Sequence, residues 1–137
     1  GYHTAMRLLD RGDEVVGIDV VNDYYSVALK NARLERLAAR DGFSFHKLDL
    51  SDRSAYDETR TAIDGVTRAI HLAAQAGVRH SIEHPFDYVD ANLVAHMTIL
   101  ELCRHQLRLR WEHKTAVCRR GPGGFASVAL CGDQTGE

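Results

Sequence analysis

Apolar residues are arranged in two kinds of segment that alternate along the chain. Segments in which apolar residues recur every three or four positions predict helices, and short apolar runs between them predict buried strands. Glycines follow several of the helical segments, as expected at helix C-termini. The predicted order is helix 1–11, strand 14–19, helix 24–40, strand 43–48, helix 52–64, strand 66–72 and a long helix from 85 to about 105.

This order indicates the fold class. Strands that alternate with helices form β-α-β units, so we expect an α/β fold built on a doubly wound parallel sheet. In the second helix, the spacing predicts that apolar residues such as Leu37 face inward and that basic residues such as Lys30 face solvent. The last helix begins at Pro85 and carries an apolar row at helical spacing, namely Phe86, Val89, Leu93, Met97 and Leu100.

The regular pattern is confined to the first part of the chain. The sequence opens on Gly1 directly inside a helical pattern, so we expect that a preceding segment is missing. After about His105, the sequence shows neither the helical nor the strand spacing. This part of the chain contains arginine-rich pieces, the glycine-rich stretch 121–124 and the short apolar run 125–131. We therefore expect one α/β domain over residues 1–105 and an irregular tail over residues 106–137.

Composition narrows the function classes. The 137 residues suffice for one ordinary domain, and 45% hydrophobic with 26% charged residues is typical of a globular protein. A net charge of −2 provides no electrostatic basis for binding nucleic acid or an anionic membrane, and no apolar run reaches the roughly 18 residues of a membrane span. Cys103, Cys118 and Cys131 are odd in number and widely spaced, which favours neither disulfides nor zinc, so we expect a cytoplasmic protein.

Gly1 and Asp19 are the first candidates for ligand binding. A glycine that opens a helix lets the N-terminal amides approach a pyrophosphate, and an acidic residue after the next strand bonds the adenosine ribose hydroxyls. The Asp19 carboxylate would repel a 2′-phosphate and no arginine follows it at positions 20 and 21, which favours NAD over NADP. The alternative is an ordinary turn that Asp19 closes.

Two further strand ends carry candidates. Asp49 could accept a hydrogen bond from an adenine amino group while Leu50 covers the ring, or it could cap the following helix together with Ser51. Small side chains in the segment 72–76 would let a planar ligand approach the backbone at the sheet edge where α/β proteins bind ligands. A tightly packed turn would use the same small residues.

Five segments carry a combined pattern. They are 14–19 (Glu-Val-Val-Gly-Ile-Asp), 22–25 (Asn-Asp-Tyr-Tyr), 48–50 (Leu-Asp-Leu), 71–79 (His-Leu-Ala-Ala-Gln-Ala-Gly-Val-Arg) and 92–93 (Asn-Leu). Together they resemble the extended short-chain dehydrogenases/reductases, in particular the UDP-glucuronate 4-epimerase branch of the NAD-dependent nucleotide-sugar epimerases. The resemblance covers residues 1 to about 105.

The resemblance implies a partial Rossmann-like domain over residues 1–105 that lacks the first strand of the sheet, with NAD as the cofactor. It also implies a UDP-sugar substrate and a homodimer for the intact enzyme. Arg79 and Ser81 would lie near the sugar nucleotide. The implied cofactor contacts are Gly1, Asp19, Asn22, Asp23, Tyr24, Asp49, Leu50, Leu72, Ala73, Ala74, Gln75, Ala76 and Asn92.

The resemblance implies reversible oxidation at C4 of the sugar, with a tyrosine and a lysine four residues later moving the proton. No Tyr-x-x-x-Lys element occurs in the sequence, so no catalytic residue is predicted. We expect a fragment that is inactive alone, marginally stable, and weak or deficient in NAD binding. His80 and His84 stand four apart without an evident third ligand, so no metal site is predicted. The alternatives are a non-catalytic NAD-binding module and a fragment of another nucleotide-sugar enzyme, such as a 4,6-dehydratase.

The tail has a separate explanation. When residues 111–124 are back-translated and read one base later, suitable codons encode a segment similar to one that follows the serine-cluster strand in these epimerases. We therefore hypothesise that residues from about 106 onward are an out-of-frame translation and are disordered. A genomic sequence whose codons forbid the shifted reading would refute this.

Overall fold

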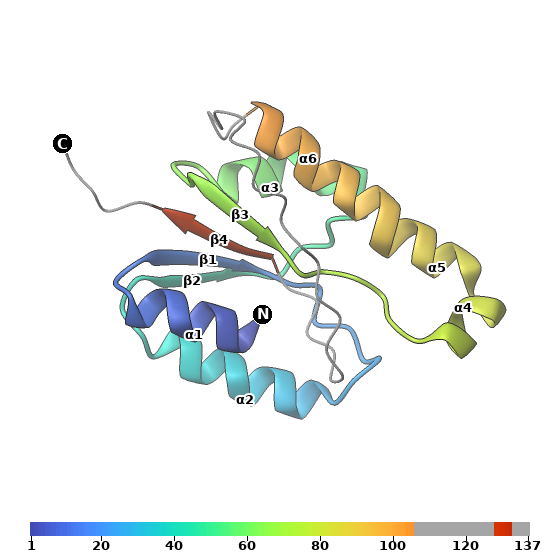
Figure 1. The fold of residues 1–137 in the computed structure, drawn as a ribbon, viewed down its shortest axis with the longest axis horizontal. Helices are drawn as coiled ribbons and strands as arrows, with labels where there is room; N and C mark the ends of the chain where they lie inside the picture. The colour runs from blue at the N-terminus through green and yellow to red at the C-terminus, as the bar shows by residue number, and fades with distance from the viewer. Residues whose placement is uncertain (106–127, 133–137) are drawn as a thin grey trace.

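The computed structural model describes residues 1–105 and 128–132 (Figure 1). Within these residues, a four-stranded sheet lies between two layers of helices, with α1 and α2 on one face and α3 and α6 on the other (Figure 1). The elements are α1 (Tyr2–Asp10), β1 (Glu14–Ile18), α2 (Val27–Ala38), β2 (Phe43–His46), a 3₁₀ turn (Arg53–Ala55), α3 (Tyr56–Ala62), β3 (Arg68–His71), α4 (Val78–Glu83), α5 (Pro85–Val89), a π-helical turn (Asp90–Val94), α6 (Ala95–His105) and β4 (Val128–Gly132).

The helices and strands predicted up to residue 72 are all present, with bounds shifted by a few residues. The long last helix is also present, but the π-helical turn interrupts it between α5 and α6. In the described part of the chain, no helix combines the length and the apolar character that crossing a bilayer requires.

The sheet has the strand order β2-β1-β4-β3. β1 and β2 are parallel, as expected. β4 is antiparallel to both of its neighbours, with Leu130 opposite Val16 on one side and Ala69 on the other. The prediction of a sheet that is parallel throughout is therefore wrong. The reason is that β4 lies within the predicted irregular tail, so the chain reaches the centre of the sheet in a direction that the β-α-β pattern does not predict.

The remainder of the predicted tail, residues 106–127 and 133–137, lies outside the described residues. The out-of-frame hypothesis stays a prediction for that part of the chain. Residues 128–132 overlap the apolar run 125–131, which the sequence pattern did not identify as a strand.

Two apolar clusters hold the layers together. One lies between α1, α2 and the sheet and contains the buried residues Ala5, Leu9, Val15 and Leu37. The other lies on the side of α3 and α6 and contains Ile18, Leu48, Leu50, Ile63, Val66, Ala95, Ile99 and Leu102. Because β1 contributes to both clusters, it is buried on both faces, as expected for a strand in the interior of an α/β sheet.

The apolar row of the last helix faces away from this core. Phe86 is 78% exposed, Leu93 is 62% exposed and Met97 is 54% exposed. The helix buries a different side, on which Ile99 and Leu102 contact the core. Together with Ile82 of α4, which is also exposed, the row forms an exposed apolar ridge, defined here as Ile82, Phe86, Val89, Leu93, Met97 and Leu100.

Candidate functional site

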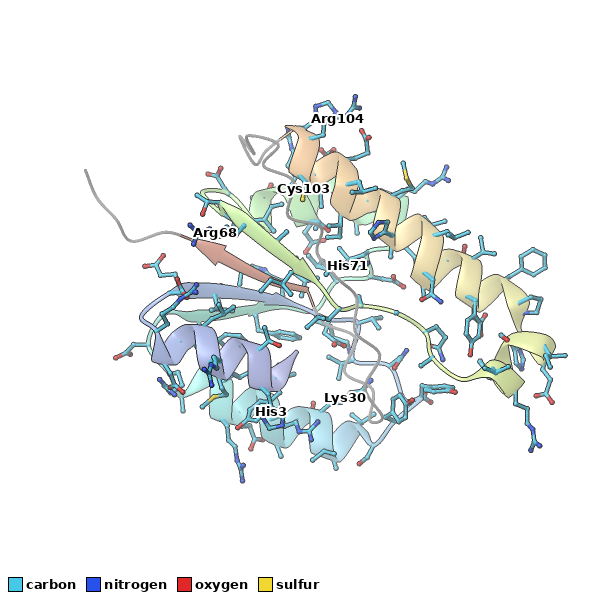
Figure 2. The ribbon with its side chains drawn as sticks, in the orientation of Figure 1. His3, Lys30, Arg68, His71, Cys103 and Arg104 are labelled. Carbon is cyan, nitrogen blue, oxygen red and sulfur yellow. The ribbon has the colours of Figure 1, made fainter. Side chains whose placement is uncertain are left out.

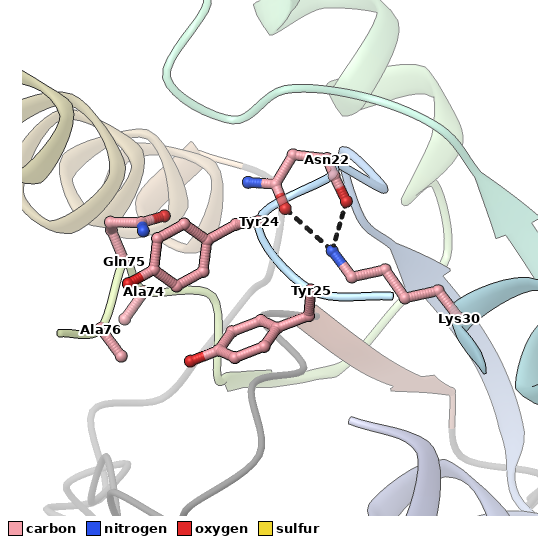
Figure 3. Close-up of a pocket in the computed structure, with 7 residues that line it drawn as sticks. All are labelled: Asn22, Tyr24, Tyr25, Lys30, Ala74, Gln75 and Ala76. Carbon is pink, nitrogen blue, oxygen red and sulfur yellow. Dashed lines mark hydrogen bonds between the residues drawn. The ribbon is translucent and has the colours of Figure 1, made fainter. Parts of the chain in front are cut away.

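The loops that follow β1, β2 and β3 meet at one edge of the sheet. β1 is parallel to β2, and β1 and β3 are both antiparallel to β4, so all three strands point the same way. Ligands of α/β proteins bind beyond the carboxyl ends of such strands. A pocket lies between the loop after β1 and the loop after β3 (Figure 3), and it is lined by Asn22, Tyr24, Tyr25, Lys30, Ala74, Gln75 and Ala76.

Asp19 follows β1 and is only 7% exposed. Its Oδ1 accepts a hydrogen bond from the Val21 amide at 2.6 Å, whereas its buried Oδ2 has no partner among the described residues. Burial raises the pKa of Asp19, and the Val21 hydrogen bond and the charge of Lys30 oppose this rise. A buried carboxylate oxygen without a donor is costly, and it is suited to accept from a ligand hydroxyl.

The backbone beside Asp19 is strained. Val21 has φ of 50°, a left-handed conformation that β-branched residues rarely adopt. Strain of this kind is found mainly at ligand clamps and active sites. At Val21 it turns the amide toward Asp19 and so fixes the orientation of the carboxylate.

Lys30 is a residue of this site that the sequence prediction missed. It was expected on the solvated face of α2, but it is 5% exposed and its Nζ donates at 2.8 Å to both the backbone oxygen and Oδ1 of Asn22 (Figure 3). The signal was present, because Lys30, Leu34 and Leu37 follow one another at four- and three-residue spacing and so share the inward face. The two bonds fasten the loop after β1 to α2.

The implied cofactor residues Asn22, Asp23 and Tyr24 lie together in that loop and are exposed. Asn22 and Tyr24 line the pocket, and Tyr24 makes an edge contact with Tyr25 at a ring-centroid distance of 4.8 Å (Figure 3). Asp23 is not among the lining residues.

The loop after β3 is held from the last helix. Asn92 pairs with the backbone of Gln75, accepting from its amide at 2.7 Å and donating to its oxygen at 3.1 Å. The Tyr88 hydroxyl donates to the backbone oxygens of Ala76, at 2.9 Å, and of Gly77. The implied contact of Asn92 with the cofactor stays a prediction, since the side chain positions the loop in this structure.

Within this loop, Ala74, Gln75 and Ala76 line the pocket, whereas Leu72 and Ala73 are partly buried and not among its lining residues. The preceding residue, His71 (Figure 2), has a buried Nδ1 that has no hydrogen-bond partner among the described residues. Burial, together with the nearby His96, lowers the pKa of His71 to about 4. The sequence did not single out this histidine.

The structure separates Asp49 and Leu50 from the pocket lining. Asp49 Oδ1 accepts from the amide of Ser51 at 2.9 Å and from its hydroxyl at 2.7 Å, whereas the cap of the following 3₁₀ turn is Asp52. Leu50 is buried in the core beside α6. An adenine contact of these two residues stays a prediction.

Arg79 and Ser81 lie on α4, outside the pocket lining. Arg79 is exposed, and the Ser81 hydroxyl donates to the Val78 backbone oxygen at 2.6 Å. His80 and His84 stack at 4.6 Å. Among the described residues no group of three or more metal-ligating side chains occurs.

Comparison with known proteins identifies the relatives of the chain. The sequence model of the family described as GDP-mannose 4,6 dehydratase matches residues 1–117. The chain is 48% identical over 105 residues to an uncharacterized 37.6 kDa protein of Escherichia coli O111:H-, covering 77% of this chain and 31% of that protein. It is 46% identical over 104 residues to a probable UDP-glucuronate 4-epimerase of Rhizobium meliloti (strain 1021), covering 76% of this chain and 30% of the relative.

A third relative is the UDP-glucuronate 4-epimerase of Thermodesulfobacterium geofontis (strain OPF15), which is 38% identical over 104 residues and is matched over 32% of its length. The chain thus spans about a third of the curated relatives it matches. The family model covers most of the chain and includes β1, β2, β3, the pocket residues and the buried Asp19 described above. The chain therefore belongs to the GDP-mannose 4,6 dehydratase family of the extended short-chain dehydrogenases/reductases.

Proposed function

We propose that the chain forms the adenosine side of the NAD site of a UDP-glucuronate 4-epimerase-like enzyme. The observation that carries this proposal is the buried Asp19 Oδ2, which lies without a donor after β1. A vicinal ribose diol would supply the missing donors, whereas the negative charge of the carboxylate would repel a 2′-phosphate. NAD, rather than NADP, is the cofactor that fits.

The residues of this chain would bind and orient the cofactor. Asp19 would accept from the ribose, the small residues Ala74 and Ala76 would leave room for a flat ring, and Lys30 would keep Asn22 in place. NAD, when bound, supplies the acceptor and later the donor of the C4 hydride. Because the sequence has no Tyr-x-x-x-Lys, the chain provides no group to move the hydroxyl proton, and we expect no turnover of UDP-glucuronate by it.

The comparisons favour an epimerase over the other candidates. Named UDP-glucuronate 4-epimerases are 38% and 46% identical to the chain over 104 residues, whereas the family model as a whole bears the description of a dehydratase. A non-catalytic NAD-binding module remains the second candidate, favoured by the absent proton-transfer pair.

The test is ligand-observed NMR with millimolar NAD, which detects weak binding. We expect saturation transfer to the adenosine protons of NAD, weaker transfer with NADP, and loss of the NAD signal in Asp19→Ala. Asp64→Ala is the matched control, because Asp64 is an exposed carboxylate in the turn before β3 and so lies at the amino ends of the strands, away from the pocket. Equal transfer in the wild type and in Asp19→Ala would overturn the proposal.

A further inference from the structure

Tyr24 crosses the pocket from one wall to the other. It belongs to the loop after β1, yet its hydroxyl lies against Gly77 of the opposite loop, where an added Cβ would be 2.5 Å away from it. The centroid of its ring lies 5.2 Å from that of His80 on α4. Figure 3 shows the ring directed toward Ala74 and Gln75, which line the opposite wall. The side chain therefore bridges the two loops between which the pocket lies.

Gly77 leaves the space that the Tyr24 hydroxyl occupies. It has φ of 110°, and a Cβ in place of its hydrogen would collide with that hydroxyl. The backbone oxygen of Gly77 accepts from the Tyr88 hydroxyl and, at 3.2 Å, from the Ser81 amide. Gly77 is thus held from α5 and from α4 at the same time. It forms a fixed surface on which the Tyr24 side chain rests.

The backbone on either side of Tyr24 is anchored. On one side, Lys30 holds Asn22 through two hydrogen bonds of 2.8 Å. On the other side, Ser26 is the N-cap of α2, and its side-chain oxygen accepts the capping hydrogen bond. Tyr24 itself is 38% exposed, and exposed side chains change rotamer within nanoseconds. The ring can therefore leave Gly77 without movement of either anchor.

A ligand of the pocket would compete with Tyr24 for the same space. The proposed cofactor would extend from Asp19, after β1, to Ala74 and Ala76, after β3, and so would pass between the two loops that Tyr24 bridges. Gln75 also lines the pocket, and its side-chain nitrogen is buried. Access of a ligand to this wall therefore requires that the Tyr24 ring leaves the opposite loop.

We propose that Tyr24 is a strap that closes the pocket by resting on Gly77 and His80, and that it swings out when a dinucleotide binds. Only the fraction of chains with an open strap is competent to bind, and the apparent affinity is reduced by that fraction. The strap rests on the contacts of Tyr24, whereas the dinucleotide as its ligand rests on the NAD function proposed above.

Tyr24→Leu tests the strap without a ligand, because leucine is too short to span the gap to Gly77. Two NMR readouts report the strap: the exchange of the Gln75 side-chain amide protons with water, and the chemical shift of the His80 ring protons, which the Tyr24 ring current displaces. We expect the His80 shift to change and the Gln75 exchange to become about tenfold faster, as for a strap closed in about nine chains of ten. Val27→Ala, at a 37% exposed residue that begins α2, is the matched control and should leave both readouts unchanged.

Gly77→Ala opens the strap from the other wall. The added Cβ displaces the hydroxyl while Tyr24 stays in the chain, so we expect both readouts to move in the same direction as in Tyr24→Leu. Gly12→Ala makes the same change at another positive φ, where the added Cβ meets nothing within 4 Å, and should leave both readouts unchanged. The proposal is overturned if the Gln75 exchange is the same in the wild type and in Tyr24→Leu, a comparison that does not depend on whether Gly77→Ala folds.

NAD is then added to the wild type and to Tyr24→Leu. We expect it to move the His80 signal of the wild type to the position found in Tyr24→Leu, and we expect Tyr24→Leu to bind NAD more tightly, by up to about tenfold. Equal or weaker affinity of Tyr24→Leu, or a His80 signal that stays in place while NAD binds, overturns the strap and leaves the proposed function standing. If the Gln75 exchange reports a closed strap and NAD binds to neither chain, the strap stands and the proposed function fails.

Discussion

Gly77 shows how closely single residues shape the pocket. It has φ of 110°, and a Cβ added to it would lie 2.5 Å from the hydroxyl of Tyr24. Tyr88 donates to the Gly77 backbone oxygen. Gly77 therefore joins three segments, namely the loop after β1, the loop after β3 and α5.

We expect Gly77→Ala to destabilise the chain beyond the usual cost of the left-handed conformation. Gly12→Ala is the matched control, because Gly12 also has positive φ, 93°, but nothing within 4 Å of an added Cβ. The control should lose about 1 kcal/mol in urea unfolding, and Gly77→Ala at least about 1 kcal/mol more, because Tyr24 must move. If the two variants lose the same free energy of unfolding, the contact with Tyr24 adds no cost to Gly77→Ala.

Lys30 is expected to hold the loop after β1 in place. Lys30→Met keeps an unbranched, buried side chain and removes the bonds to Asn22, so we expect a loss of about 1–3 kcal/mol in urea unfolding. The Val21 amide should exchange faster, and the pKa of Asp19 should rise further without the lysine charge. Arg36→Met, an exposed change on the same helix, should stay within about 0.5 kcal/mol.

His71 makes stability depend on pH in a defined direction. Its pKa is lowered to about 4 from 6.5, so the unfolded chain binds a proton that the folded chain excludes. Above pH 6.5 His71 is neutral in both states and has no effect on stability; as pH falls from 6.5 toward 4 it destabilises the fold, by no more than about 1.4 kcal/mol per pH unit. Partial solvent exposure reduces that slope.

Urea unfolding between pH 7 and pH 5 checks this effect of His71. His71→Asn should flatten the decline, whereas His3→Asn, at an exposed histidine of α1, should leave it unchanged. Asp19 titrates in the opposite sense, since its pKa is raised, and the comparison of the two variants removes its contribution. A decline that is the same in all three chains would contradict the assignment to His71.

At the scale of elements, the exposed apolar ridge on α4 to α6 is a candidate protein–protein interface. Six large apolar residues of α4, α5, the π-helical turn and α6 expose between 42% and 78% of their surface. Large exposed apolar surfaces on proteins often mark interfaces. We propose that the ridge joins two copies of the chain, in line with the homodimer that the family resemblance implies. A helix ridge repeated around a two-fold axis is self-complementary.

Met97→Glu tests this proposed interface of the ridge. Met97 is 54% exposed, so the change should not unfold the chain, but it would place a charge in the apolar contact. We expect sedimentation to show a dimer for the wild type and a monomer for Met97→Glu. Leu29→Glu, at a 51% exposed leucine of α2, should remain dimeric. A wild-type chain that is monomeric at all concentrations would exclude the ridge as an interface.

The sequence predicted the positions of the helices and strands better than it predicted which surfaces they contact. Period alone located β1, β2 and β3, because each is a short apolar run between helical segments. The spacing of apolar residues could not show that the ridge faces solvent, because an apolar row has the same spacing whether it contacts the core or another molecule. Residues 128–132 were missed because the apolar run 125–131 follows a stretch without helical or strand periodicity, so no preceding element indicated that a strand should come there.

Part of the candidate site could likewise be predicted from the sequence. Asp19 and the small residues after β3 follow from the rule that ligands bind at strand ends, and the structure brings Ala74, Gln75 and Ala76 into one pocket with Asn22 and Tyr24. The inward position of Lys30 follows from its spacing with Leu37, but its bonds to Asn22 and the contacts of Tyr88 and His71 join separate segments, which local spacing does not report.

At the scale of the whole molecule, β4 connects the two parts of the sheet. A chain that ends at residue 127 would leave β1 and β3 with unpaired edges, so we expect it to lose cooperative urea unfolding. A chain that ends at residue 132 retains β4 and should unfold like the complete chain. Cooperative unfolding of the chain that ends at 127 would show that the helices alone hold the two parts together.

The same connection has a consequence for synthesis on the ribosome. Glu14 pairs with Gly132 across nearly the whole described chain, although β1, β2 and β3 all leave the ribosome before β4 is made. At about 5–20 residues per second, the nascent chain passes seconds with two bare strand edges, which are templates for aggregation. A chaperone that covers extended apolar segments would act in that interval, and its work would end when Gly132 emerges.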